Sequence, residues 1–232
     1  MTTPVSRRTS GPSASAQPDP TGTSPGTRTP RRRAGWIAMT FLATVTAVVA
    51  ARYFTLDRAL FLAQQRAVYA ANLVPLLFHV GGGVLALATG PWQFVPGVRT
   101  RYPAVHRTVG RIYLLGALAA GTGGLLLVPK GLYWPVAPLG FAALATALLV
   151  TTGKAFTAIR RRAVAAHQRW MVRSYALIFA AVTFRLWLAA GSGAGLPFDL
   201  AYMSGAWLSW TINLLVAQRL VARLGSRRRT AR

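Results

Sequence analysis

The chain has 232 residues, 53% of them hydrophobic and 13% charged, whereas soluble domains average roughly 25% charged residues, so the composition disfavours an ordinary globular enzyme. Its 27 lysines and arginines and three acidic residues give a net charge of +24, but these cations lie between apolar segments of about 18–22 residues, the length that crosses a hydrocarbon core of ~30 Å. We therefore expect a multi-pass membrane protein without a nucleic-acid partner. The sequence contains no cysteine, which excludes disulfides and metal sites with thiolate ligands.

Residues 1–33 differ in composition from the rest of the chain, because Pro, Ser, Thr and Gly dominate and no apolar periodicity is present. This composition predicts a disordered tail. An all-α, polytopic transmembrane helical bundle of about six helices follows at residues 34–218, with a basic C-terminal tail at 219–232. Glycine- and proline-rich breakers separate its helices, which we expect at Ala34–Tyr53, Asn72–Ala88, Thr108–Val128, Pro135–Phe156, Trp170–Leu188 and Phe198–Val216.

The first helix allows two interpretations. Arg31–Arg33, the apolar run after them and the small residues Ala50 and Ala51 also fit a cleaved signal peptide, although the long tail before them favours a retained span. The connection after this helix, Phe54–Ala71, is long and has apolar residues at helical spacing. We expect a short interfacial helix there, with an apolar face of Tyr53, Leu56, Leu60 and Ala63.

The distribution of cations predicts the orientation of the bundle. With the N-terminus inside, 22 of the 27 lysines and arginines fall in the two tails and the inner loops. Cytoplasmic loops carry such an excess, so we expect both termini in the cytoplasm. Arginines next to the helix ends would then contact anionic lipid headgroups, which are the expected partners.

His79 is the histidine that we expect deepest in the bilayer, within the second helix. Its helical face continues through Gly83, Ala86 and Gly90, small residues that allow a helix or a flat ligand to approach closely. A histidine at this depth needs a partner. That partner is either a functional ligand or a hydroxyl or backbone carbonyl that only holds helices together, and the second role is favoured.

Two further histidines lie at helix starts: His106 opens the third helix and His167 precedes the fifth. Because these two helices run in the same direction, we expect the two histidines at the same depth in the membrane. Two histidines from separate helices at one level could ligate one b-type haem, whose propionates would bind nearby arginines. Alternatively, both histidines lie at the headgroup level and bind lipid phosphate or cap the helix starts. In either case the candidate anion ligands are Arg107, Arg111, Arg169 and Arg173.

Arg185 lies near the outer end of the fifth helix, eighteen residues and therefore five turns after His167. Asp199 opens the next helix across a short glycine-rich loop. We expect Arg185 and Asp199 to form a structural ion pair, in which Asp199 also suits a helix N-terminus. Asp19 and Asp57 lie outside the apolar segments too, so no intramembrane carboxylate is present for proton-coupled transport and no carboxylate pair for acid–base catalysis.

Three separated blocks of the sequence resemble one bacterial family. They include LALATGPWQF after His79, HRTVGRIY from His106, and HQRWMVRSYAL from His167. Over residues 72–188 the chain is similar to the predicted membrane proteins grouped as domain-of-unknown-function family 2306. The resemblance implies a polytopic bacterial inner-membrane protein without an established activity. Gln168 stands where the family pattern leads us to expect arginine, which removes one positive charge beside His167.

Two functions follow from these residues, and neither includes a predicted catalytic residue. The first, which requires least, is a non-catalytic integral membrane protein that binds a lipid, a small hydrophobic ligand or a protein partner through its small-residue faces. The alternative is a membrane redox protein that binds one b-type haem through His106 and His167. Whether the protein is an enzyme stays open at this point.

Overall fold

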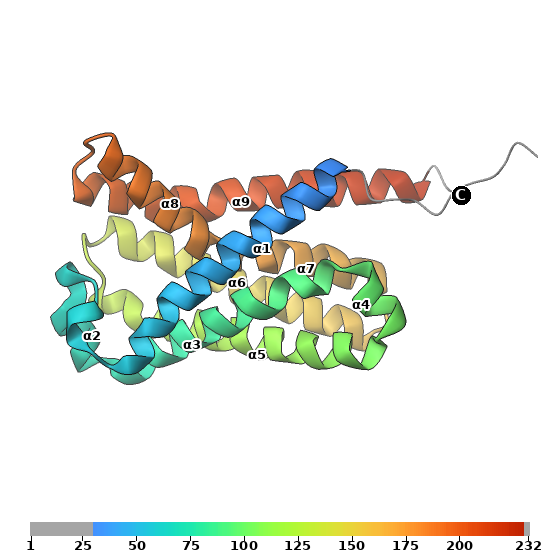
Figure 1. Ribbon diagram of the computed structural model, residues 1–232, viewed down its shortest axis with the longest axis horizontal. Helices are drawn as coiled ribbons and strands as arrows, with labels where there is room; N and C mark the ends of the chain where they lie inside the picture. The colour runs from blue at the N-terminus through green and yellow to red at the C-terminus, as the bar shows by residue number, and fades with distance from the viewer. Residues whose placement is uncertain (1–29, 230–232) are drawn as a thin grey trace, which may run out of the picture.

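The computed structural model describes residues 30–229, with side chains placed for residues 33–223, and this part of the chain contains helices and turns but no β-strand. Six helices in it are long and apolar enough to cross a membrane, which confirms the predicted all-α transmembrane bundle. They are α1 (Pro30–Ala51), α3 (Leu73–Thr89), α5 (Pro103–Leu127), α6 (Val136–Arg160), the consecutive pair α7 (Val164–Ile178) and α8 (Ala180–Gly193), and α9 (Phe198–Arg229) (Figure 1).

Short helices connect these spans at both ends of the bundle. Between α1 and α3 lie η1 (Arg52–Thr55), η2 (Arg58–Leu60), η3 (Ala63–Gln65) and α2 (Arg66–Ala71), between α3 and α5 lie η4 (Gly90–Phe94) and α4 (Pro96–Arg101), and η5 (Val128–Lys130) follows α5.

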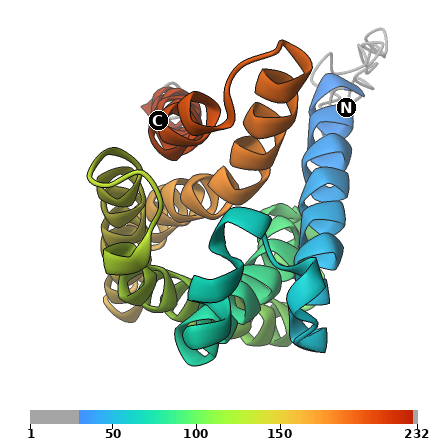
Figure 2. The same cartoon turned by 90° about the vertical axis from the view of Figure 1, so that its left-hand side faces the viewer.

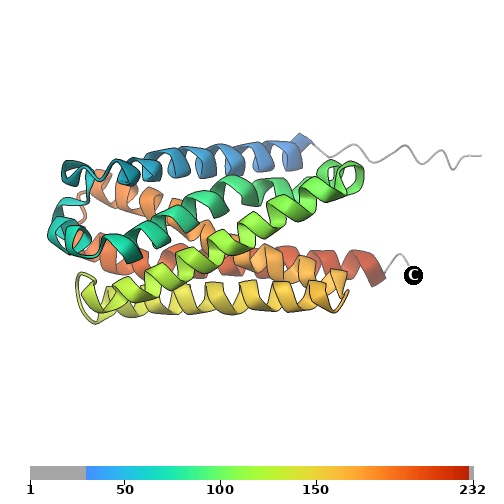
Figure 3. The ribbon, with the colours of Figure 1, turned by 90° about the horizontal axis from the view of Figure 1, so that it is seen from below.

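The two ends of the bundle differ in composition, and we name them by their residues. The start of α1 and the end of α9 lie at the same end as α4 (Figures 1 and 3). We call this the basic end, because Arg99, Arg107 and Arg169 lie there, and the opposite end, with α2, Tyr53 and Tyr69, the tyrosine end.

The first and last helices extend beyond their predicted bounds. α1 begins at Pro30, within the predicted tail, and residues 1–29 of that tail lie outside the described residues. α9 continues past the predicted end at Val216 to Arg229. It continues because residues 217–224 are Ala, Gln, Arg, Leu and Val, without glycine or proline to end the helix.

The segment between α1 and α3 is not the single interfacial helix that we predicted. It is broken into short turns because Leu56 adopts a left-handed backbone conformation (φ 59°) and the Asp57 side chain caps η2 by accepting from the Ala59 N–H at 2.9 Å. The predicted apolar face is also wrong. Leu56 is 48% exposed, whereas Phe61 and Gln65 are buried.

The predicted fifth helix is interrupted at Phe179, where α7 ends and α8 leaves its line (Figures 1 and 2). The side chain of Asn213 on α9 explains the interruption. Its Nδ2 donates to the Ala176 carbonyl at 3.1 Å, and its Oδ1 accepts from the Thr183 hydroxyl at 3.1 Å. A side chain that binds a carbonyl of the helical ladder bends the helix. The straight helix assumed between His167 and Arg185 therefore does not exist.

Helices α3 and α5 approach each other through glycine residues. A Cβ atom added to Gly82 would collide with the Ala120 backbone, and one added to Gly123 would lie 2.5 Å from the His79 nitrogen. The small-residue face predicted on α3 is confirmed at Ala86 and Gly90, which contact α5, but not at Gly83, because Gly82 makes the contact in its place. Close backbone approach at small residues is the usual basis of helix association in membranes.

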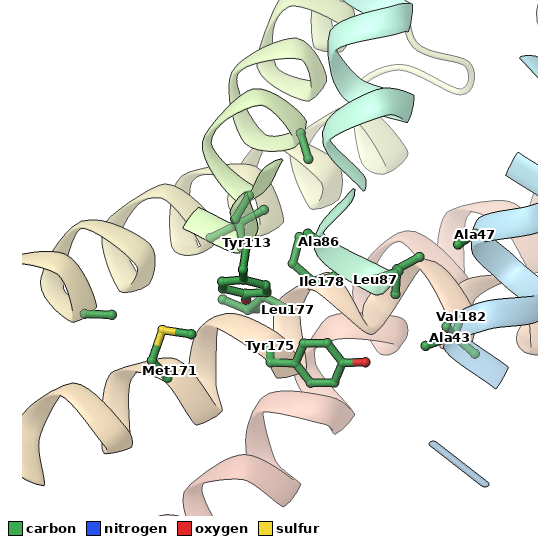
Figure 4. Close-up of a cluster of buried hydrophobic side chains, with 14 residues drawn as sticks. Ala43, Ala47, Ala86, Leu87, Tyr113, Met171, Tyr175, Leu177, Ile178 and Val182 are labelled. Atoms are coloured by element: carbon green, nitrogen blue, oxygen red, sulfur yellow. The ribbon is translucent and has the colours of Figure 1, made fainter. Parts of the chain in front are cut away.

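The buried core combines side chains from α1, α3, α5, α6, α7 and α8 (Figure 4). It contains a chain of buried hydroxyls, in which Ser174 Oγ lies 2.8 Å from the Tyr113 hydroxyl and 2.9 Å from that of Thr152. Ala43 and Ala47 of α1 are also buried in this core. In the described structure α1 is therefore a packed member of the bundle.

Candidate functional site

A cavity of about 390 Å³ lies among α1, α3, α5, α6, α7, α8 and α9 and reaches the tyrosine end. Its walls are mostly apolar, and its volume is within the roughly 300–1,000 Å³ typical of small-molecule sites. Leu148 and Leu177 lie on its wall, as does Gly83, whose missing side chain leaves space there. The polar residues on the wall are Thr46, Arg52, Tyr53, Gln65, Tyr69, His79, Arg185, Tyr202 and Ser209.

His79 lines this cavity and also holds α3 against α5. Its Nδ1 lies 2.9 Å from the carbonyl oxygen of Ala120. Because a carbonyl only accepts, Nδ1 carries the proton and donates it, so Nε2 of the neutral ring is an acceptor. A backbone carbonyl is one of the partners expected for His79, and the structure also places the residue on the cavity wall.

Arg185 lies on α8 and lines the same cavity, in the neighbourhood of Tyr53 and Tyr69. Its Nη1 donates to the Ala181 carbonyl, one turn earlier on α8, at 2.8 Å. Asp199 lies in the first turn of α9. Within the described residues, Arg185 binds this carbonyl and is not hydrogen-bonded to Asp199. The predicted ion pair is therefore not formed in this part of the chain.

The segment between α1 and α3 closes the tyrosine end of the cavity with aromatic rings. The buried Phe61 ring stacks on Tyr53 at a centroid distance of 5.4 Å and meets Tyr69 edge-on at 6.1 Å. Gln65 Nε2 donates to the Tyr202 hydroxyl of α9 at 3.0 Å. Burial raises the pKa of the Tyr69 phenol, so this group stays protonated and is able to donate a hydrogen bond.

At the basic end, His106 and His167 lie close enough for their imidazoles to interact electrostatically, and Arg99 is a further neighbour of His106. His167 Nδ1 donates to the Ala155 carbonyl of α6 at 2.8 Å and thereby joins α7 to α6. His106 Nδ1 is buried and has no hydrogen-bond partner within residues 33–223. His106 near the start of α5 and His167 near the start of α7 therefore lie at the same end of the bundle, in agreement with the common depth expected for them.

The haem alternative gains no support from this arrangement. The cavity described above is lined by neither His106 nor His167. Within the described residues, no three or more His, Asp or Glu side chains are grouped so that they could hold a metal ion. A ligating histidine is usually oriented by a hydrogen bond from its second ring nitrogen, and His106 lacks one at Nδ1.

The four arginines predicted as anion ligands have different surroundings. Arg107, Arg111 and Arg169 are exposed at the basic end. Arg173 is half-buried: its Nη2 donates to Gln218 Oε1 of α9 at 2.8 Å and its guanidinium lies 4.7 Å from the centroid of the Trp170 ring. Binding of lipid headgroups stays a prediction for all four arginines.

Sequence reasoning missed Tyr53, Tyr69, Gln65 and Ser209 as members of the site. The two tyrosines resemble an ordinary interfacial belt of aromatic residues in the sequence. They come near Arg185 only because the segment between α1 and α3 folds back over the end of the bundle. No local spacing or motif contains that information.

Comparison with known proteins is consistent with a membrane bundle. The family model described as predicted membrane protein (DUF2306) matches residues 76–221, which include α5 to α8 and most of α3 and α9. No curated protein and no solved structure matches the chain.

Proposed function

The chain belongs to the DUF2306 family of predicted membrane proteins, and for this membrane protein we propose a non-catalytic function, the binding of a small hydrophobic or amphipathic molecule inside the bundle. The observation that carries the proposal is the cavity of about 390 Å³ between the membrane-spanning helices. Most pockets that bind small molecules have apolar walls with a few placed polar groups, and this cavity has that composition.

The polar groups of the cavity favour binding over catalysis. His79 uses Nδ1 to join α3 to α5, and Tyr202 is held by Gln65. A hydrolytic nucleophile needs a base within hydrogen-bond reach. Ser209 has no hydrogen-bond partner in the described residues, so it has no such base.

The most direct test is to fill the cavity without disturbing the helices. Gly83 lines the cavity, and an added Cβ there meets no atom within 4 Å, so we expect Gly83→Leu to fold normally while its side chain occupies ligand space. Binding of tritiated decanol to protein in neutral detergent, measured by scintillation proximity, should weaken about tenfold or more.

Gly153→Leu is the matched control for this substitution. Gly153 is also a glycine within a span, α6, with no atom within 4 Å of an added Cβ, but it does not line the cavity. We expect its decanol binding to equal that of the unaltered protein. Equal binding by Gly83→Leu as well would contradict the cavity as the binding site.

We also propose that the basic end faces the cytoplasm of a bacterial inner membrane. The exposed Arg107, Arg111 and Arg169 support this orientation, because positively charged residues accumulate on the cytoplasmic side and anionic headgroups attract them there.

Reporter fusions test this orientation directly. Alkaline phosphatase, which is active only outside the cytoplasm, should be active when fused after Lys130 at the tyrosine end and inactive when fused at the C-terminus. A green fluorescent protein fused at the same two places should give the opposite pattern. Phosphatase activity at the C-terminus would reverse the proposed orientation.

A further inference from the structure

Resting on the proposed function, we propose that the ligand of the cavity is an amphipathic anion, whose carboxylate or phosphate head binds Arg185 and whose apolar tail lies against the inner walls. The first support is charge. Among the described residues, the cavity wall carries the cations Arg52 and Arg185 and contains no acidic side chain. An anion would therefore enter an environment of complementary charge.

The lack of a charged partner for Arg185 is the second support. Its backbone is eight residues, or about 12 Å, from the end of α8 at Gly193, and the exposed Arg185 side chain lies near Tyr53 and Tyr69 at the tyrosine end. A cation within a membrane-spanning helix is costly unless it is paired. Of the five N–H groups of its guanidinium, one binds the Ala181 carbonyl, and the described residues supply no carboxylate for the others. An anionic head would supply the missing partner.

Ser209 gives an independent sign of a ligand. Its side chain is 1% exposed and lines the cavity, and its Oγ has no hydrogen-bond partner within the described residues. Buried hydroxyls in proteins are almost always paired. A hydroxyl can donate to an anionic oxygen, so Ser209 is a second polar group of the cavity that a ligand atom would satisfy.

The tyrosine end adds further donors for an anion. Tyr202 accepts from Gln65, which leaves its own phenolic proton available to donate. The phenol of Tyr69 is a neighbour of Arg185 and lines the cavity. The inner walls are mostly apolar, because Leu87, Leu148 and other apolar side chains surround His79 there. Polar donors at one end and apolar walls at the other fit a molecule with a head and a tail.

Three probes that share an unbranched alkyl tail but differ in the head group test the inference: decanoate, decyl phosphate and decanol. The binding of each to the full chain is measured in neutral detergent. We expect decanoate or decyl phosphate to bind the unaltered protein about tenfold or more tightly than decanol, because hydrogen bonds to a charged group are the stronger ones. Arg185→Gln should lose about tenfold of the anion affinity and leave decanol binding unchanged. Ser209→Ala should lose a smaller part of the same affinity.

Arg58→Gln is the control, because Arg58 is an exposed arginine at the same end that does not line the cavity, and its anion affinity should not change. Arg185→Lys keeps the charge and should retain most of the affinity, which separates loss of charge from loss of folding.

The outcomes separate this inference from the proposed function. A preference for decanoate identifies a fatty-acid-like ligand and a preference for decyl phosphate a phosphate headgroup, and both support an anion site. Equal binding of all three probes, unchanged in Arg185→Gln, would overturn the anion site but keep the cavity as a hydrophobic site. Binding of none of them would overturn both proposals.

Discussion

Replacing Gly82 by alanine is expected to destabilise the bundle, although it adds only one methyl group. The new Cβ would lie between the backbones of α3 and α5, where it would collide with the Gly116 carbonyl and the Ala120 nitrogen. Because backbone atoms cannot rotate away, the helices must separate, at a cost of about 1–3 kcal/mol or more. Thermal unfolding in detergent should show a midpoint lower by several degrees, at roughly 2–4 °C per kcal/mol.

The same substitution at Gly153 is expected to have the opposite sign. Nothing lies within 4 Å of an added Cβ at this position, so Gly153→Ala should gain about 1 kcal/mol from the higher helix propensity of alanine. Two helical glycines would thus respond in opposite directions to one methyl group. A stabilised or neutral Gly82→Ala would show that α3 and α5 are not in backbone contact.

Replacing Asn213 by leucine should give the second large effect. Leucine has the same number and branching of side-chain heavy atoms but cannot bind the Ala176 carbonyl or accept from Thr183. The carbonyl at the break between α7 and α8 is then left unpaired, at a cost of about 1–3 kcal/mol. We expect a lower unfolding midpoint in detergent, together with weaker decanol binding, because residues on both sides of the break line the cavity.

Thr211→Val is the control on the same helix. The Thr211 hydroxyl donates to the Trp207 carbonyl, one turn earlier on α9, and not to another helix. Its loss should change the unfolding midpoint by less than about half of the Asn213→Leu effect. Equal effects of the two substitutions would indicate that Asn213 does not determine the break.

The six spans could be predicted from the sequence because apolar length and breakers are local properties. The bend at Phe179 could not, because it depends on Asn213, which lies over thirty residues away and looks like an ordinary polar residue of the last helix. The segment between α1 and α3 was mispredicted for a similar reason. Its apolar spacing is helical, but Asp57 forms a cap and Leu56 turns the chain, so tertiary contacts of Phe61 and Gln65 decide its shape.

The candidate site was only partly predictable. His79 and Arg185 are identifiable in the sequence as polar residues inside apolar segments, and both line the cavity. The partner expected for Arg185, Asp199, follows from nearness in the chain, whereas the structure provides neighbours from η1 and α2, more than a hundred residues earlier. Nearness in sequence was a poor guide because α8 bends toward α1.

The contact between α3 and α5 has a consequence for the divergence of related chains. Gly116 and Gly123 are seven residues apart and therefore face the same side of α5, where each lies against the backbone of α3. A relative that exchanged its histidines and arginines for a new ligand would change the cavity but could not enlarge these residues without separating the helices. Distant members with different activities should therefore be recognisable by the register of small residues on these two helices, even after their binding residues have diverged.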